Sequence, residues 1–404
     1  MKKVISTEKI PIKMWLDDIE EGALKQAKNL ANLPFVFKHI AIMPDAHLGF
    51  GCPIGAVVAT KGVVIPNLVG VDISCGLCAV KTSLTEIDTE TLKKIMGEIR
   101  KAIPVGFNKH KEPQDEKLMP KGIDTVAKAE EFGAFNPPIC EDKEINNNAR
   151  KSLGTLGGGN HFIEIQKGSD GHIWIMIHSG SRNLGLKVAN YYNRLAQKLN
   201  ERWFSSVSKQ WDLAFLPIET DEAKAYLREM NYCVEFALAN RKLMMNRITD
   251  IFDNLIDTEM TADIEFDEMI NIAHNYAKFE NHFGQNVIVH RKGATLATKD
   301  TIGIIPGSQG TSSYLVKGKG NPDSFNSCSH GAGRKMGRRD AQRRLNLEEE
   351  KKKLDEKGII HSVRNVRDLD EAPGSYKDIL KVMKNQEDLV EILVELNPLA
   401  VIKG

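Results

Sequence analysis

The spacing of hydrophobic and polar residues predicts a chain in which strands end in polar, glycine-rich loops. Strands are predicted over residues 36–43, 55–64, 68–82, 286–290, 302–305 and 399–404. Helical periodicity predicts helices over residues 17–30, from 184 to about 199, over 221–256 and over 375–396. Because strands and long helices alternate without a βαβ rhythm, the pattern favours an α+β fold with a mixed β-sheet core surrounded by helices.

Chain length limits the domain organisation. At 404 residues the chain is longer than a single hydrophobic core usually grows, and we expect one compact domain over residues 1–404 with a polar surface excursion at about residues 86–151. The lysines of this excursion either line a path for RNA or an acidic partner, or are only solvated. They are Lys101, Lys109, Lys111, Lys117 and Lys121.

Composition is that of an ordinary globular protein, with 41% hydrophobic and 27% charged residues. No apolar run approaches the roughly 20 residues that a membrane span needs, and Ser6, Thr7 and Glu8 interrupt any signal-peptide core after Met1. We therefore expect no membrane association and a cytoplasmic location, which the scattered cysteines also favour. A net charge of +1 neither indicates nor excludes a nucleic-acid partner.

A β-hairpin is predicted over residues 161–178, with glycine clusters at both ends and a loop at residues 168–171. If Lys167 pairs with His172, then His161 lies opposite His178, and the two imidazoles converge on one metal ion or substrate group. This register places Trp174 and Met176 on the same face as Ile163 and Ile165 and turns Glu164 to the other face. The alternative is a buried hairpin with two hydrogen-bonded core histidines.

Other polar residues cluster where predicted strands end. Asp45 and His47 follow the strand over residues 36–43, in a turn that either holds a ligand or is simply solvated. Asp72 and Cys75 lie three apart beside glycines, a pair suited to a transition metal such as Mn²⁺ or Zn²⁺, while Cys78 is expected to point into the core.

Two further segments carry candidate chemistry. Arg182 begins a helix whose N-terminus could bind an anion. His330 stands among small residues, so its imidazole is either an accessible nucleophile or a surface histidine without a role.

Eight motifs together give the chain a family resemblance. PDAHLG, GVDISCG, GTLGGGNHFIEI, HSGSR, AHN, HRKGAT, IPGSQGTSSY and SCSHGAGR occur in this order between residues 44 and 334. This succession resembles the RtcB family of RNA ligases over essentially the whole chain. The resemblance implies a GTP- and Mn²⁺-dependent enzyme of RNA repair or tRNA splicing. Such an enzyme joins RNA ending in a 3′-phosphate or 2′,3′-cyclic phosphate to RNA with a 5′-hydroxyl, in some cases with an accessory activator protein.

The resemblance also implies roles for individual residues. Metal ligation falls on Asp72, Cys75, His161, His178 and His274, with Cys75 bridging two ions. The nucleophile that takes the nucleotide falls on His330. Nucleotide contacts fall on Asn160, His161, Phe162, Glu164, His274, Asn275, Pro306, Gly307, Ser308, Gln309, Ser313, His330, Gly331, Ala332, Gly333, Tyr376 and Lys403. Candidates for holding the RNA phosphates are Arg182, Arg291, Lys292 and Arg334.

The chain departs from the usual family pattern at three positions. Ser74 and Asn183 stand where the family usually has Gly, and Gln309 stands where it usually has Met, beside the expected nucleotide. A basic run from Arg334 to Arg344 is either an RNA-binding surface or a solvated helix. The competing functions are a non-catalytic RNA-binding or repair scaffold and a metal-dependent phosphodiesterase. An intact His330 argues against the scaffold, and a nucleotide pocket argues against the phosphodiesterase.

Overall fold

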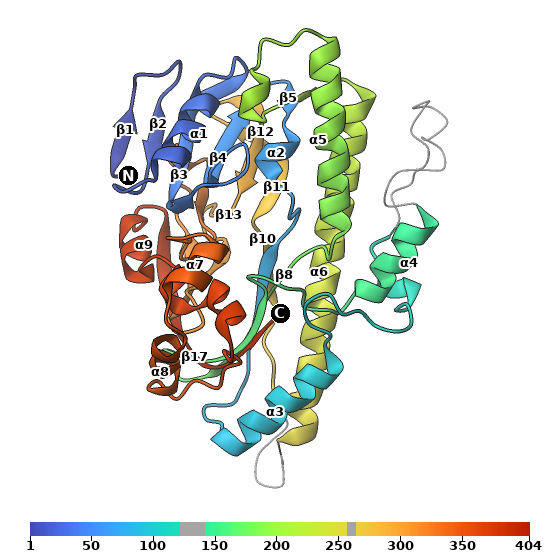
Figure 1. Ribbon diagram of the computed structural model, residues 1–404, viewed down its shortest axis with the longest axis vertical. Helices are drawn as coiled ribbons and strands as arrows, with labels where there is room; N and C mark the ends of the chain where they lie inside the picture. The colour runs from blue at the N-terminus through green and yellow to red at the C-terminus, as the bar shows by residue number, and fades with distance from the viewer. Residues whose placement is uncertain (122–141, 257–263) are drawn as a thin grey trace.

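Two β-sheets form the centre of the protein in the computed structural model, which describes residues 1–121, 142–256 and 264–404 (Figure 1). The six-stranded sheet has the order β1 (Lys3–Ile5), β2 (Ile12–Met14), β3 (Val36–His47), β4 (Ile54–Thr60), β12 (Gln285–Lys292), β11 (Asn275–His282). The seven-stranded sheet has the order β10 (Ile270–Ala273), β6 (Gly76–Lys81), β8 (Ile173–Ser179), β7 (Phe162–Gly168), β17 (Val390–Lys403), β15 (Ser313–Gly318), β14 (Ile302–Ile305). Short pairs join β13 (Ala294–Leu296) to β16 (Ser327–Ser329) and β5 (Val63–Val64) to β9 (Leu216–Pro217).

Helices cover these sheets, which confirms the predicted α+β class (Figure 1). Only the β2–β3 pair is parallel among the named strands, so the six-stranded sheet is mixed and the seven-stranded sheet is antiparallel. The described helices are α1 (Glu21–Ala31), α2 (Pro66–Val69), α3 (Thr89–Ala102), α4 (Lys143–Ser152), α5 (Leu184–Arg202), α6 (Asp221–Leu255), α7 (Arg338–Arg344), α8 (Leu347–Asp355) and α9 (Ile379–Asn385). None of them combines the length and apolarity that a membrane crossing requires.

The seven-stranded sheet is buried on both faces. Ile163, Ile165 and Ile175 belong to one face, which packs against α3 and the C-terminal half of α6. Met176 lies in the core of the other face, together with Leu354 of α8. Burial on both faces explains why β8 is almost continuously apolar, whereas β7 buries the polar Glu164 and Gln166 on the face opposite Ile163 and Ile165.

Helix α6 spans the height of the molecule beside α5 (Figure 1). It begins after Thr220, whose hydroxyl accepts a hydrogen bond from the backbone N–H of Ala223. The predicted range of 221–256 is therefore confirmed to within one residue.

Three sequence predictions about the fold are wrong at least in part. The expected strand over residues 68–82 is confined to β6, because Pro66 begins the short helix α2 and Ser74 has a left-handed backbone conformation just before the strand starts. The expected helix over residues 375–396 is the short helix α9 followed by β17, because residues 390–396 pair with β15 and the strand continues through residues 396–403, which pair with β7. The expected polar excursion at residues 86–151 is partly core, because α3 buries Leu92, Ile95 and Ile99 against the neighbouring elements. Residues 122–141 of that excursion lie outside the described residues.

Candidate active site

Four of the five predicted metal-binding residues lie at one end of the seven-stranded sheet. Cys75 directly precedes β6, His178 is the penultimate residue of β8, and His274 directly follows β10. Strand β6 is antiparallel to both neighbours, and its first residue lies opposite the last residue of each. His161 directly precedes β7, which pairs with β8. Residues far apart in the sequence thus meet, because in an antiparallel sheet one strand begins where its neighbours end.

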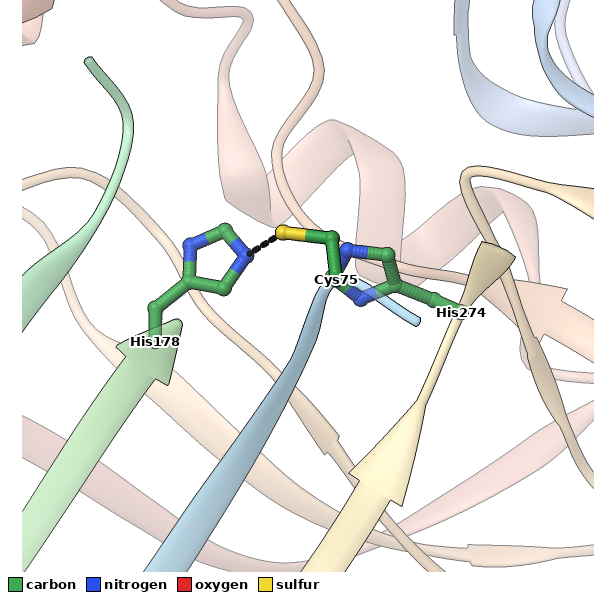
Figure 2. A group of neighbouring side chains, drawn as sticks. All are labelled: Cys75, His178 and His274. Atoms are coloured by element: carbon green, nitrogen blue, oxygen red, sulfur yellow. Dashed lines mark hydrogen bonds between the residues drawn. The ribbon is translucent and has the colours of Figure 1, made fainter. Parts of the chain in front are cut away.

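The donor atoms of this cluster are close enough for one metal ion. Sγ of Cys75 lies 3.2 Å from Nε2 of His178 and 3.4 Å from Nε2 of His161. The donor atoms of Cys75, His178 and His274 all lie within 4.8 Å of one another, and Figure 2 shows the two rings on either side of the thiol. Metal–nitrogen bonds of roughly 2 Å and metal–sulfur bonds of roughly 2.3 Å can be reached from this arrangement by small side-chain movements.

Hydrogen bonding in the cluster also suits a metal. Nδ1 of His178 donates to the backbone oxygen of Asn160 at 3.1 Å, which leaves the lone pair of Nε2 directed toward Cys75. The buried Nδ1 of His274 has no hydrogen-bond partner among the described residues. A metal ion would satisfy such a buried polar atom, which otherwise carries a desolvation cost.

Burial sets the protonation states of the donors. It lowers the pKa of His161 to about 3 and the pKa values of His178 and His274 well below their ordinary range. The imidazoles are therefore neutral, which is the form that binds metals. Burial raises the pKa of the Cys75 thiol to about 12, and the nearby Asp72 carboxylate adds to that shift. A metal ion must therefore displace the thiol proton when it binds.

Asp72, the fifth predicted ligand, lies on the open side of this cluster. Its side chain is exposed and lines the adjacent pocket. Its backbone oxygen accepts hydrogen bonds from the backbone N–H of Cys75 and from Nδ2 of Asn275, each at 3.0 Å. These two hydrogen bonds therefore fix the turn between Asp72 and Cys75.

The predicted register of the hairpin is wrong by one residue, although the hairpin itself is confirmed. Phe162, rather than His161, lies opposite His178, and Glu164 lies opposite Met176. Glu164 therefore shares a face with Met176, while Ile163 lies on the other face. The pair of histidines still converges, with ring centroids 5.5 Å apart, because His161 lies just before the strand and its side chain is not bound to the strand alternation.

A pocket of about 520 Å³ opens beside this cluster of Cys and His side chains. Most of the predicted nucleotide-binding residues line it: Asn160, Phe162, Glu164, Pro306, Gly307, Ser308, Gln309, His330, Gly331, Ala332, Gly333, Tyr376 and Lys403. Ser313 lies behind the wall, where its Oγ accepts a hydrogen bond from the backbone N–H of Gly307. The remaining three predicted nucleotide-binding residues lie in or beside the Cys/His cluster: His161 and His274 belong to it, and Asn275 directly follows His274.

His330 lines the pocket where it adjoins His274 of the Cys/His cluster. Its ring centroid lies 4.9 Å from that of His274, and its side chain is 17% exposed. Nδ1 donates to Oδ2 of Asp45 at 2.7 Å, and the backbone N–H of His330 donates to the same oxygen at 3.0 Å. The carboxylate fixes the proton on Nδ1, so Nε2 carries the free lone pair.

The far part of the pocket holds a carboxyl, an ammonium and an aromatic ring. Glu164 accepts a hydrogen bond from Nε2 of Gln166 at 2.7 Å, and burial raises the pKa of Glu164 to about 8. Burial also lowers the pKa of Lys403, which β17 delivers beside Phe162. The hydroxyl of Tyr376 donates to Glu371. These groups offer stacking and hydrogen bonds to a flat polar ring system.

Comparison with known proteins places this site in a family. A family model described as tRNA-splicing ligase RtcB matches residues 26–404. The chain is 38% identical to an RNA-splicing ligase RtcB of Escherichia coli (strain K12), over 100% of this chain and 99% of that protein. It is 34% identical to a tRNA-splicing ligase RtcB of Nanoarchaeum equitans, over 98% and 95% of the two chains. The chain belongs to the RtcB family.

Four basic residues are predicted from the sequence to hold RNA phosphates, and the structure engages all four within the protein. Arg291 is fully buried and pairs with Glu280 through both terminal nitrogens, so the structure does not bring it to the pocket. Nζ of Lys292 donates to two backbone oxygens, and Arg182 donates to Thr155 and to a backbone oxygen, away from the pocket wall. Arg334 does line the pocket, but its guanidinium is bound to Glu371 and to backbone oxygens.

Several residues that surround the RtcB pocket are not assigned to it by sequence alone. The sequence marks Asp45 only as part of a turn, yet it is fully buried against His330. Glu371 binds Arg334, Arg338 and Tyr376. No local pattern marks Glu371, whereas a polar pair at the end of an apolar strand is a usable signal for Asp45.

The three departures from the usual RtcB pattern have visible structural consequences. Ser74 and Asn183 adopt left-handed backbone conformations, with φ of 59° and 73°, which explains why glycine suits these positions. Nε2 of Gln309 donates to the backbone oxygen of Glu371 at 2.9 Å. This bond ties the 306–310 loop to residues 366–371, and a methionine side chain could not form it.

Proposed function

We propose that this protein is an RNA ligase that joins RNA 3′-phosphate or 2′,3′-cyclic phosphate ends to 5′-hydroxyl ends, using GTP and two Mn²⁺ ions. The observation that carries the proposal is the position of His330. Its ring lies beside His274 of the Cys/His metal-donor cluster and lines the pocket, and Asp45 holds Nδ1, so Nε2 is the nitrogen left for attack. A nucleophilic histidine that takes a nucleotidyl group needs this division of its two nitrogens.

The proposed reaction has three balanced steps. Nε2 of His330 attacks the α-phosphorus of GTP, a P–N bond forms, and the bond to the β-phosphate breaks to release pyrophosphate. An oxygen of the RNA 3′-phosphate then displaces the histidine from the same phosphorus and forms an RNA-3′-pp-guanosine. The 5′-hydroxyl oxygen finally attacks the terminal RNA phosphorus, forms the phosphodiester and releases GMP. A 2′,3′-cyclic end must first be opened by water.

The chain's own residues divide the remaining work. As His330 attacks, its ring becomes positively charged, and the carboxylate of Asp45 stabilises that charge. Cys75, His161, His178, His274 and Asp72 would hold the metal ions, which supply charge neutralisation at the phosphates and lower the pKa of a bound water or hydroxyl. The neutral imidazoles and the unpartnered Nδ1 of His274 among the described residues support this assignment.

The base end of the pocket supports a guanosine nucleotide. The carbonyl oxygen of the Glu164 carboxyl can accept a hydrogen bond from an N–H group of a guanine edge, Lys403 can donate to the guanine carbonyl oxygen, and the ring of Tyr376 can stack on the base.

Mass spectrometry after incubation with GTP and Mn²⁺ tests the proposal. We expect a GMP adduct on His330, its loss in His330→Ala, and ligation of a 3′-phosphate RNA to a 5′-hydroxyl RNA by the wild-type protein. GMP labelling that persists in His330→Ala would refute the role of His330. RNA cleavage without a nucleotide adduct would favour a phosphodiesterase, and RNA binding without either would favour a scaffold. Adding an accessory protein to the ligation assay shows whether an activator is needed.

A further inference from the structure

Asn240, in the middle of α6, binds the loops on both sides of the central hairpin. Its Oδ1 accepts hydrogen bonds from the backbone N–H groups of Gly154, at 2.7 Å, and Thr155, at 3.2 Å. Its Nδ2 donates to the backbone oxygens of Thr155 and Gly180 and to Oγ of Ser179, at 3.1 to 3.2 Å. The amide is fully buried. One side chain therefore joins the loop that leads to His161 with the residues that follow His178.

Arg241, the next residue of α6, binds three segments of the same centre, one of which Asn240 also contacts. Its Nη1 donates to the backbone oxygens of Ser179, at 2.9 Å, and Ser74, at 3.3 Å. Its Nε donates to Oδ1 of Asn271 at 2.7 Å. Ser74 precedes Cys75, Ser179 follows His178, and Asn271 lies on β10, which leads directly to His274. The guanidinium thus contacts a residue in or beside each strand that carries a donor of the Cys75, His178 and His274 group.

The contacts join places where the ligand strands come closest. A Cβ built on Gly180 would lie 3.3 Å from Cα of Cys75, so the backbone after His178 packs directly on the backbone of Cys75. Asn240 binds the oxygen of this glycine, and Arg241 bridges the residues on either side of the contact. A shift of either side chain would change the spacing of the two metal donors.

The charge of Arg241 is unusual for a purely structural contact. The residue is fully buried, and its hydrogen bonds with the described residues go to neutral oxygens. Its Nη2 has no hydrogen-bond partner in the same part of the chain. Buried charges are ordinarily paired, and a neutral side chain could anchor a helix to a sheet at a smaller desolvation cost. The planar guanidinium instead reaches acceptors in three segments at once, which a neutral side chain with fewer donors could not do.

We propose that Asn240 and Arg241 are positioning residues of the metal centre, which set the spacing of Cys75, His161, His178 and His274 by fixing the backbone of the segments that carry them. This inference rests on the proposed metal-dependent function. It assigns a role to α6, which contributes no ligand itself.

Titration of the metal-free full-length protein with Co²⁺ tests the inference. The thiolate-to-cobalt absorption band reports the Cys75–metal bond, and competition with Mn²⁺ gives the affinity for that ion. Arg241→Met removes the guanidinium, and Arg241→Lys keeps a charge but cannot reach three acceptors at once. Arg247→Met is the matched control for Arg241, because Arg247 lies on the same helix and binds His110, Gln114 and the oxygen of Gly154. It shares the Gly154 loop with Asn240, but none of these bonds goes to the segments that carry Cys75, His178 and His274, which Arg241 joins. The melting temperature of each metal-free variant is measured alongside.

We expect Arg241→Met to weaken Co²⁺ and Mn²⁺ binding about 10- to 100-fold and to change the cobalt spectrum. Arg241→Lys should lie between Arg241→Met and the wild type, and it carries the same test if Arg241→Met does not fold. Asn240→Ala should weaken binding in the same direction. Arg247→Met should lower the melting temperature while leaving the metal affinity and the spectrum unchanged.

Two results would overturn the inference. Unchanged affinity and spectrum in a folded Arg241 variant would show that the residue does not position the ligands, and losses in Arg247→Met that match those in Arg241→Met would show a general stability effect. Failure of the proposed function is recognised separately. It would appear as a wild-type protein that gives no thiolate band, or one whose band survives in Cys75→Ser, and either result removes the metal centre and this inference with it.

Discussion

Replacing Asp45 with Asn tests how the pocket prepares its histidine for attack. One carboxylate oxygen accepts two hydrogen bonds, from Nδ1 of His330 at 2.7 Å and from the backbone N–H of His330 at 3.0 Å. The carboxyl group is fully buried. Asparagine has nearly the same shape and can still accept both bonds, but without the negative charge.

The expected loss follows from the change in bond type. A hydrogen bond to a charged group contributes about 1.5–3 kcal/mol, and one between neutral groups contributes about 0.5–1.5 kcal/mol. Losing the charge from both bonds therefore costs about 2–3 kcal/mol where it matters most, in the transition state that places positive charge on the ring. At about 1.4 kcal/mol per factor of ten, we expect GMP transfer to His330 to slow about 30- to 150-fold.

Single-turnover GMP transfer from labelled GTP measures this rate without interference from the later RNA steps. Asp340→Asn is the control, because Asp340 also lines the pocket but pairs with Arg343 and does not contact His330. Its rate should stay within a few-fold of the wild type. A wild-type rate in Asp45→Asn, or equal losses in both variants, would show that the Asp45–His330 contact does not prepare the nucleophile.

Other changes test the metal centre and the fold. Cys75→Ala should abolish Mn²⁺ binding, whereas Cys78→Ala should only lower the unfolding free energy by about 1 kcal/mol, because Cys78 is a core residue. Equilibrium dialysis measures the metal bound by each variant, and equal metal loss from both would support a Cys-x-x-Cys site instead. Since burial keeps the Cys75 thiol protonated up to about pH 12, metal binding should release one proton and Mn²⁺ affinity should rise about tenfold per pH unit near neutrality. The neutral imidazoles add nothing to that slope, so an affinity that does not vary with pH would contradict a protonated Cys75 thiol as the metal-free state. Burial alone would raise the pKa of Glu280, but hydrogen bonds from His282 and Arg291 lower it from 4.5 to about 2. A lowered carboxyl pKa stabilises the fold above pH 4.5, by at most about 3 kcal/mol, and this contribution disappears as the pH falls toward 2. The difference in unfolding free energy between the metal-free wild type and Glu280→Gln should therefore shrink on acidification, and a constant difference would refute the pairing.

Local sequence pattern predicts most of the elements but not how the chain ends. Residues 221–256 carry a long periodic pattern directly after Thr220, which caps the helix, and α6 matches the predicted range. Residues 390–396 also fit a helical pattern, and only pairing with strands distant in sequence makes them part of β17. The proline at position 398 lies at a bulge of that strand, where its missing N–H is tolerated. Tertiary pairing of this kind cannot be obtained from a single sequence window.

The site shows the same division between local signals and long-range contacts. Cys75, His178 and His274 each stand beside a glycine cluster or at a strand end, which the sequence displays directly. The contact between Asp45 and His330 joins residues 285 positions apart, and the position of Glu371 depends on a loop without a repeating pattern. Buried ion pairing with Glu280 also keeps Arg291 from the pocket. The sequence could not predict this, because no local feature distinguishes an arginine that binds substrate from one that forms a buried ion pair.

The one-residue error in the hairpin register explains which part of the prediction was robust. A shift by one residue exchanges the two faces of a strand, so it moved Glu164 onto the face of Met176. It did not separate His161 from His178, because His161 precedes β7 and its ring direction is set by the glycine-rich turn rather than by the pleat. The positions of residues at strand ends are fixed by the pairing of the strands, which brings these ends together on one side of the sheet. For this reason the convergence of metal donors depended on topology, and the arrangement of the base pocket depended on register.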